Sequence, residues 1–415
     1  MSEGWFALVE SNTTGSGRQF CARARERGLR PVVLAADPAR YPYLLDDGLH
    51  CELLDTGDLE QVVQVCRSLR GRLAAVTTSS DHFTVLAAQA AARLGLPGPD
   101  PEAVRRCRLK DRQRAALAAG GVRIPAYGRA GDVASAIRLA GTIGLPVVVK
   151  PVTGSGSVGV LMCATLNEVA DHAGALLASA TDERGAAVPR SVLVEELVRG
   201  EEFSVETFGR QVVAVVAKRL GRPPHFVETG HDVPAVLSEA DRAALGTLAL
   251  RALQALGLGF GAAHTEARLT GRGPVVIEVN PRLAGGMIPD LVQLATGMDL
   301  VSAVVASAVG EPVSLSPDRY RHASIRFILA PGWGIVRALH GLPEARQVQG
   351  VERATFTVEI GDRIGVTHSF RDRIGHVVAT ADDADTAGDR ADRAALNLRV
   401  SMDRLPRSPI TSENP

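Results

Sequence analysis

Two neighbouring segments combine strand-like alternation with acidic side chains, and this combination restricts the chain most. They are His264–Arg268 and, one short strand and turn later, Ile277–Arg282. Side chains two residues apart lie on the same face of a strand, so Glu278 shares a face with Asn280. A hairpin joining the two segments would bring Glu266 beside them. Two carboxylates and an amide oxygen would then meet at one place.

Such an oxygen set suits Mg²⁺, which typically takes one or two carboxylates and completes its shell with substrate phosphates. Two such ions can bridge the β- and γ-phosphates of a nucleotide and offset charge during phosphoryl transfer. Arg268 and Arg282, on the same strands, would supply anion contacts. The alternative is an ordinary hairpin with a polar row facing solvent, although the neighbouring core valines fit that alternative poorly.

A second feature joins a lysine to a glycine-rich loop. Leu145–Pro151 is an apolar strand that ends near Lys150, and the small-residue stretch Thr153–Gly159 follows, before another strand at Val160–Cys163. Polyphosphate binding requires an ammonium group and backbone N–H groups that approach closely because glycine has no Cβ. Purely structural hairpins can look the same. The order of strand, loop and strand predicts a hairpin lid.

Lysine is almost absent from the chain. Of its 46 basic residues only three are lysines, namely Lys110, Lys150 and Lys218. An ammonium is a compact point charge, whereas a guanidinium is a planar fork. Each remaining lysine is therefore a candidate for a role that arginine cannot fill.

Size, charge and cysteine content narrow the class of protein. A chain of 415 residues exceeds one hydrophobic core and predicts two or three subdomains. Acidic and basic residues balance at 46 each, so we expect a small-molecule partner rather than nucleic acid or a membrane surface. The five cysteines form no C-x-x-C pair, which argues against disulfides and a zinc site. Met1–Val9 lacks a signal-peptide pattern and no apolar run reaches about 20 residues, so we expect a cytoplasmic protein.

The alternation of apolar runs and helical stretches predicts three units. Residues 1–98 read as a βαβ domain that ends at a Pro/Gly break, residues 99–190 as a small lid subdomain and residues 191–415 as an antiparallel α+β subdomain with an extension. Within them we expect one helix over Glu102–Ala119 and another around Glu239–Leu256. The turn Ser11–Gly17 is either a flexible connection or an anion contact. No motif is recognisable after about residue 312.

At this point a family resemblance emerges. The strand ending in Lys150, the glycine-rich loop, the stretch Val194–Phe203 and the segment Glu278–Arg282 together resemble the ATP-grasp superfamily in order and spacing. The resemblance covers roughly residues 96–309. It implies an ATP-grasp fold of mixed α/β and α+β class, with an N-terminal Rossmann-like domain, a small flap subdomain and a C-terminal antiparallel sheet.

The resemblance also implies roles for individual residues. It implies two Mg²⁺ ions, with Mn²⁺ as a substitute, held by Glu266, Glu278 and Asn280. Arg282 and Arg268 would be catalytic anion contacts. ATP would be bound by a set in which Glu195 and Leu197 lie near the adenine and Glu202 near the ribose; the full set is Lys110, Lys150, Gly154, Ser155, Gly156, Ser157, Val158, Glu195, Leu197, Val198, Glu202 and Lys218.

Within the superfamily, the chain is most similar to the L-amino-acid ligase group. The similarity rests on Phe226–Ala235, which contains Gly-His-x-x-Pro, and on the glycines after Arg282. It implies that His231 and Gly285 line an acceptor pocket, where a histidine could orient or deprotonate an amine. A turn histidine satisfied by its own loop is the alternative.

The resemblance implies a ligase that activates a carboxylate as an acyl phosphate and condenses it with an amine, releasing ADP and phosphate. The substrates would be small molecules, and the superfamily favours homodimers. Two alternatives keep the nucleotide site, namely a bicarbonate-activating carboxylase and a non-catalytic ATP-binding regulator. An oxidoreductase would leave the middle of the chain unexplained.

Overall fold

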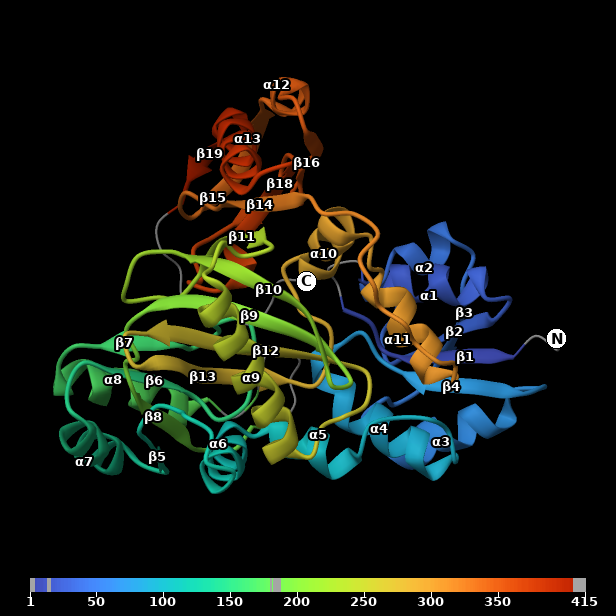
Figure 1. The fold of residues 1–415 in the computed structure, drawn as a ribbon, viewed down its shortest axis with the longest axis horizontal. Coiled ribbons are helices and arrows are strands. Elements are labelled where there is room, and N and C mark those ends of the chain that lie inside the picture. Colours follow the sequence, from blue (N-terminus) through green and yellow to red (C-terminus); the bar gives the residue numbers. More distant parts are fainter. Residues whose placement is uncertain (1–3, 13–15, 180, 182–187, 406–415) are drawn as a thin grey trace.

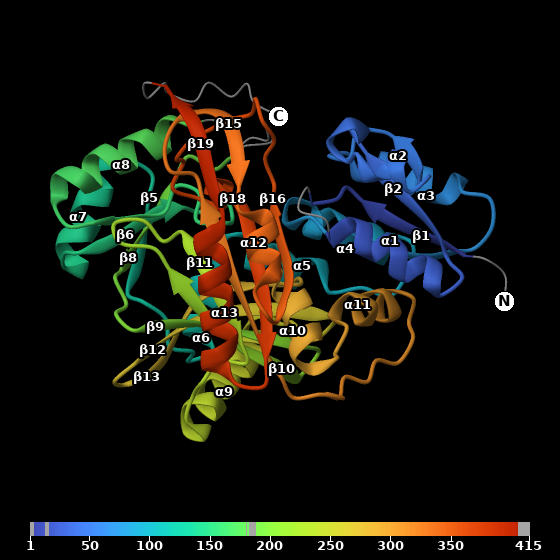
Figure 2. The ribbon, with the colours of Figure 1, turned by 90° about the horizontal axis from the view of Figure 1, so that it is seen from above.

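The computed structural model describes residues 4–12, 16–179, 181 and 188–405 of the 415-residue chain. Figure 1 shows an N-terminal sheet (blue) at one side of a large central sheet, a small sheet with its helices (green) at the lower left, and the C-terminal elements (red) at the top. Figure 2, seen from above, again shows the N-terminal sheet apart from the small sheet. The large sheet therefore connects the other parts.

The N-terminal part is a parallel sheet with the strand order β3-β2-β1-β4. Strand β1 is apolar on both faces: Phe6 and Leu8 pack on the side of α1 and α11, and Ala7 and Val9 on the side of α3 and α4. Continuous apolar runs are typical of parallel strands covered on both faces. This confirms the predicted βαβ pattern. The elements are β1 (Trp5–Val9), α1 (Ser16–Glu26), β2 (Arg30–Ala35), α2 (Tyr43–Asp46), β3 (His50–Leu53), α3 (Leu59–Ser68), β4 (Leu73–Thr77), α4 (Thr84–Arg93) and, from later in the chain, α11 (Leu300–Ala308).

The small sheet is antiparallel, with the order β5-β8-β6-β7 and with α7 and α8 packed on one face. Residues 147–149 pair with residues 161–163, which confirms the predicted hairpin around the glycine-rich loop. The boundary predicted at residue 190 precedes β8, a strand that pairs with β5 and β6. The elements are β5 (Tyr127–Ala130), α7 (Val133–Ile143), β6 (Val147–Pro151), β7 (Leu161–Cys163), α8 (Leu166–Ala178) and β8 (Val192–Glu196).

The large sheet has eight strands in the order β13-β12-β9-β10-β11-β14-β18-β16, and all of its printed pairings are antiparallel. Its first half comes from the middle of the chain and its second half from the C-terminal part. Its strands are β9 (Glu201–Phe208), β10 (Gln211–Leu220), β11 (Glu228–Val233), β12 (Ala262–Thr270), β13 (Gly273–Asn280), β14 (His322–Leu329), β16 (Val351–Phe356) and β18 (Arg373–Ala381).

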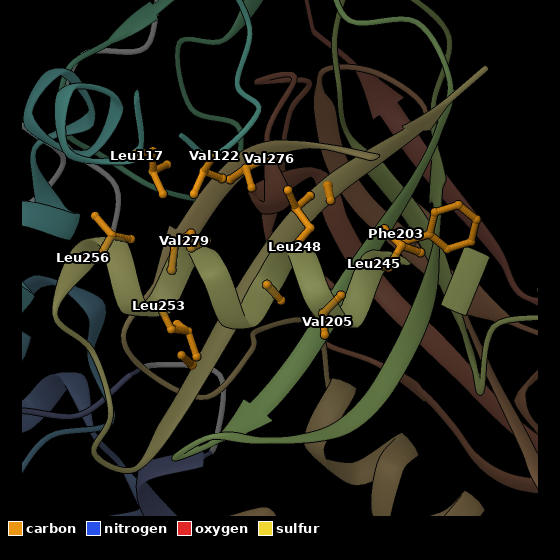
Figure 3. Close-up of a cluster of buried hydrophobic side chains, with 14 of the residues drawn as sticks. Leu117, Val122, Phe203, Val205, Leu245, Leu248, Leu253, Leu256, Val276 and Val279 are labelled. Carbon is orange, nitrogen blue, oxygen red and sulfur yellow. The ribbon is translucent and has the colours of Figure 1, made fainter. Parts of the chain in front are cut away.

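Alternation along these strands separates a packed face from a polar one. Val205, Ala267 and Val279 point to the helix α9 (Glu239–Leu256) and form the cluster of Figure 3. Their neighbours Glu206, Glu266 and several other charged side chains point to the opposite face. The helix α10 (Ile288–Thr296) covers the far part of that polar face, over β11 and β14. The remaining polar area faces the small sheet and holds the candidate site.

The C-terminal part adds a three-stranded sheet of order β17-β15-β19 and two helices. Helix α13 packs on β14 and β18, beside α12 and β16. The predicted final helix is confirmed, with Asp383 as its N-cap. The elements are β15 (Gly334–His340), α12 (Leu342–Gln347), β17 (Arg363–Ile364), α13 (Ala384–Asn397) and β19 (Arg399–Arg404).

Two local predictions are wrong. The single helix predicted over Glu102–Ala119 is two helices, α5 (Pro101–Arg108) and α6 (Lys110–Ala119), because Leu109 between them is extended. The segment expected as a Gly-His-x-x-Pro loop is instead strand β11, paired with β10 and β14. Both differences place functional candidates more rigidly than expected.

Among the described residues no single helix is long and apolar enough to cross a membrane. Helices α10 and α11 meet those criteria only when taken together, and they are bent by 108° at the break between them.

Removal of core volume from α9 should destabilise the protein. Leu245 is fully buried in the cluster of Figure 3, so Leu245→Ala should lower the free energy of unfolding by about 2–5 kcal/mol. Leu396 is exposed on α13, and Leu396→Ala should change it by less than about 0.5 kcal/mol. Urea unfolding followed by circular dichroism compares the two; equal losses would contradict the packing described.

Candidate active site

The acidic hairpin β12-β13 forms with the register that the sequence predicts. Glu266 lies directly opposite Glu278, and His264 lies opposite Asn280. The two carboxylates and the amide therefore share one face of the sheet. Among the described residues no group of three or more His, Cys, Asp and Glu side chains forms a metal-binding cluster. The oxygen set fits Mg²⁺ only if substrate oxygens complete its shell, which is the usual arrangement for this ion.

All three lysines of the chain reach glutamates of the site. Lys110 Nζ lies 3.1 Å from Glu278 Oε1, and Lys218 Nζ lies 2.8 Å from Glu266 Oε1. Lys150 Nζ lies 2.6 Å from Glu195 Oε2. The lysines come from α6, β10 and β6 respectively, and all three are buried. The predicted candidates are thus brought together by ion pairs that connect separate elements.

The break between α5 and α6 positions Lys110. Its backbone N–H donates to Val152 O (2.9 Å), and its Nζ donates to Gly154 O (2.8 Å). A continuous helix would engage that N–H in its own hydrogen-bond ladder. Lys110 therefore links the start of the glycine-rich loop to Glu278 on the hairpin.

Lys150 and Glu195 form a buried triad with Arg114, which the sequence interpretation missed. Arg114 Nε donates to Glu195 Oε1 (2.7 Å), and its Nη2 donates to Ile277 O (2.5 Å). Burial alone would raise the pKa of Glu195, but Arg114 and Lys150 outweigh it and lower that pKa to about 2. Burial lowers the pKa of Lys150, and Glu195 opposes this effect. The spacing of four between Lys110 and Arg114 on one helix could have indicated this second cation.

Lys218 is the most heavily paired of the three lysines. Besides Glu266, its Nζ lies 2.9 Å from Glu202 and 2.7 Å from Glu228. Burial would lower its pKa, but the three carboxylates outweigh burial and raise it well above its ordinary value. Glu266 also contacts His264 (3.1 Å), whose second ring nitrogen lies 2.8 Å from Glu206. Burial opposes protonation of His264, yet these glutamates raise its pKa to about 9, so it carries a positive charge.

The two predicted catalytic arginines hold neighbouring parts of the site. Arg268 Nε donates to Glu202 (2.9 Å), and its Nη1 donates to Val198 O (2.6 Å) in the connection that contains Leu197. Arg282 lies 3.0 Å from Asp81 in the N-terminal region. Burial would raise the pKa of Asp81, but Arg108, at 2.6 Å, and Arg282 hold it well below its usual range.

The glycine-rich loop is contacted by segments far along the chain. Gly154, Gly156 and Ser157 all have positive φ, and the hydroxyl of Ser157 donates to Phe226 O (3.0 Å). A Cβ on Gly156 would collide with the ring of Phe370, which lies in the short 3-10 helix η3 (Phe370–Asp372). No sequence motif indicated this contact.

The remaining predicted loop positions, Ser155 and Val158, hydrogen-bond to each other within the loop: Ser155 O accepts from the Val158 N–H (3.4 Å).

His231 lies beside Lys218 in the sheet register and is fully buried. Neither of its ring nitrogens has a hydrogen-bond partner within the described part of the chain. Burial lowers its pKa to about 3, so the imidazole is neutral. The alternative of a turn histidine satisfied by its own loop is wrong, because His231 lies within β11. Gly285, the other predicted pocket residue, lies in the loop between β13 and α10.

The N-terminal turn is described only in part, since residues 13–15 of the predicted Ser11–Gly17 turn lie outside the described residues. Asn12 Oδ1 accepts from the Gly17 N–H (3.3 Å), and the Asn12 N–H donates to Ser79 Oγ (3.1 Å). These contacts fix the turn against the end of β4.

Comparison with known proteins gives two family matches. The ATP-grasp domain family matches residues 143–290, and the L-amino acid ligase C-terminal domain 2 family matches residues 326–403. The first range contains the acidic hairpin and the second contains β14 to β19. The C-terminal part, in which the sequence showed no motif, thus has an identified family.

Individual relatives agree with these matches. The uncharacterized protein y4rH of Sinorhizobium fredii is 37% identical over 95% of this chain and 82% of its own length. Carnosine synthase 1 of Gallus gallus is 32% identical over 70% of this chain, which spans only 33% of that protein. The crystal structure of the L-amino acid ligase from Bacillus licheniformis superposes with a TM-score of 0.81 and 23% identity, covering 97% of this chain and 99% of that one, which shows a shared fold.

The triad around Glu195 should make stability depend on pH. Because the pKa of Glu195 is lowered to about 2 from an ordinary 4.5, its ionisation stabilises the fold above pH 4.5 and loses that effect as pH falls toward 2. The full contribution is about 3 kcal/mol. We expect the difference in unfolding free energy between wild type and Glu195→Gln to shrink as pH falls from 6 to 3 in urea titrations. A constant difference would contradict this, and exposed Glu344→Gln should show no difference at either pH.

Proposed function

Because the chain belongs to the ATP-grasp superfamily, in the group that carries the L-amino acid ligase C-terminal domain, and is therefore an ADP-forming carbon–nitrogen ligase, we propose that it joins an amino-acid carboxylate to an amine. A carboxylate oxygen of the donor bonds to the γ-phosphorus of ATP, and ADP leaves. The amine nitrogen then attacks the acyl carbon, and phosphate leaves. The product is an amide or peptide bond.

One observation carries this proposal: all three lysines of the chain converge on the glutamates of one buried site. Lys110 and Lys150 lie at the glycine-rich loop, where ammonium groups can offset phosphate charge. Glu266, Glu278 and Asn280 would hold Mg²⁺, which supplies charge compensation at the transferring phosphoryl group. Without such ligands these carboxylates are already paired with lysines, so the site is pre-arranged for exchange of charged partners.

The remaining residues have separate roles in the proposal. Arg282 would hold the acyl phosphate, and neutral His231 would accept a hydrogen bond from the amine at a ring nitrogen. Arg268 would act indirectly, since it orders Glu202 and the Val198 carbonyl at the expected ribose and adenine positions. Closure of the glycine-rich loop would exclude water, which otherwise hydrolyses an acyl phosphate. A homodimer and a cytoplasmic location stay predictions.

A substrate matrix tests the reaction class. Purified protein with ATP and Mg²⁺ should release ADP only when a suitable amino-acid donor is present, and mass spectrometry should detect a condensed amide when an amine is added. ADP release that depends on bicarbonate instead would favour the carboxylase alternative and overturn the proposal.

Loss of one hairpin carboxylate should abolish turnover. Glu278→Gln removes a proposed Mg²⁺ ligand and the partner of Lys110, so we expect the rate of ADP release to fall at least about 100-fold, as for loss of one preorganised electrostatic group. Glu344→Gln on exposed α12 is the matched control and should keep the wild-type rate. A Glu278→Gln variant with wild-type turnover would remove this residue from the site.

A further inference from the structure

A buried histidine without partners marks a place where a ligand group belongs. His231 lies on β11, which is followed across the sheet by β14 and β18. Both ring nitrogens lack a hydrogen-bond partner within the described part of the chain, although the residue is 1% exposed. Buried polar groups are almost always paired. An unpaired and neutral imidazole is therefore suited to receive a donor from a bound molecule.

Gly286 shows what else borders this space. A Cβ built on Gly286 would lie 2.5 Å from His231 Nε2 and 3.6 Å from Arg373 Nη1. Because one point is close to both atoms, the imidazole and the guanidinium border the same small volume. The backbone of Gly286 has φ +59°, a conformation that glycine adopts without strain. Glycine thus leaves open a space that any side chain would fill.

Arg373, at the start of β18, is held so that its third nitrogen faces this space. Its Nη2 donates to Glu228 Oε2 (2.6 Å) and its Nε to Glu228 O (3.3 Å). Its guanidinium also stacks on Phe327, 3.9 Å from the ring centroid. These contacts fix the guanidinium plane, with Nη1 on the side of Gly286.

The charge on Arg373 is only partly compensated. Glu228 is shared between Arg373 and Lys218, which lies 2.7 Å from its other oxygen. One carboxylate between two cations leaves attraction for a further anion. A fixed guanidinium is well suited to a carboxylate, which it can bind through hydrogen bonds and charge together.

We propose that Arg373 binds the carboxylate of the amine substrate, so that the acceptor is an amino acid held with its amine toward His231 and its carboxylate on Arg373. This inference rests on the proposed function and deepens it, because it names the class of acceptor. The aromatic ring of Phe327, which meets His231 edge-on at 5.5 Å and stacks on Arg373, forms the apolar wall between the two polar ends. Arg373 is thereby a specificity-determining residue contributed by the C-terminal domain.

The test compares acceptors that differ only at the carboxylate. Once a productive donor and amino-acid acceptor are known from the substrate matrix, kcat/KM is measured for that acceptor and for its primary amide, at saturating ATP and donor. Wild type should prefer the acid by at least about 10-fold. In Arg373→Gln this preference should disappear through a higher KM for the acid, while the kcat/KM for the amide changes less than about threefold.

A structural role for Arg373 predicts a different result. If the variant loses activity equally with acid and amide, the arginine only supports the fold and the inference is wrong. Arg371→Gln, an exposed arginine in the same short helix η3, is the matched control and should keep the wild-type preference. If wild type forms amides but does not distinguish acid from amide, the inference fails while the proposed function stands. If no donor and amine give a condensed product, the proposed function itself fails.

Discussion

The site depends on the pairing of buried glutamates with lysines that come from different elements. A buried carboxylate that loses its partner costs about 3–5 kcal/mol, so the polar face of the hairpin is stable only when cations reach it. Those cations arrive from α6, β6 and β10, and each ion pair therefore also fixes the position of one element relative to another. Lys110 illustrates this, since its ammonium binds both Glu278 and the Gly154 carbonyl. Charge compensation and domain arrangement are one constraint here.

Local periodicity explains what could be predicted from the sequence. The opposition of Glu266 and Glu278 followed from strand alternation and a short turn, and helix α9 was predicted with its observed bounds. The three lysines were singled out by composition alone. Their convergence required only that the motifs belong to one sheet and one loop, which the order of the motifs indicated.

The missed parts of the site are contacts between segments distant in the sequence. Arg114 reaches Glu195 across 81 residues, and Arg373 reaches Glu228 across 145. No local pattern encodes such a contact. Strand β11 was read as a loop because its residues, Glu228–Val233, are mostly polar and include a glycine, and only pairing with β10 and β14 makes it a strand. The break at Leu109 was missed because the residues on both sides favour helix.

The C-terminal domain completes the site from both ends of the reaction path. Its short helix η3 places Phe370 against Gly156 of the glycine-rich loop, and the strand that follows begins with Arg373 beside Glu228. The turn is itself rigid, because Asp372 accepts hydrogen bonds from the N–H groups of Thr367 and His368. The loop that would cover ATP and the arginine that would hold the acceptor are thus separated by two residues of one ordered segment. A displacement of that segment must move both, so closure over the nucleotide and shaping of the acceptor pocket are mechanically linked. This linkage gives a physical reason why an ATP-grasp core and this particular C-terminal domain occur in one chain.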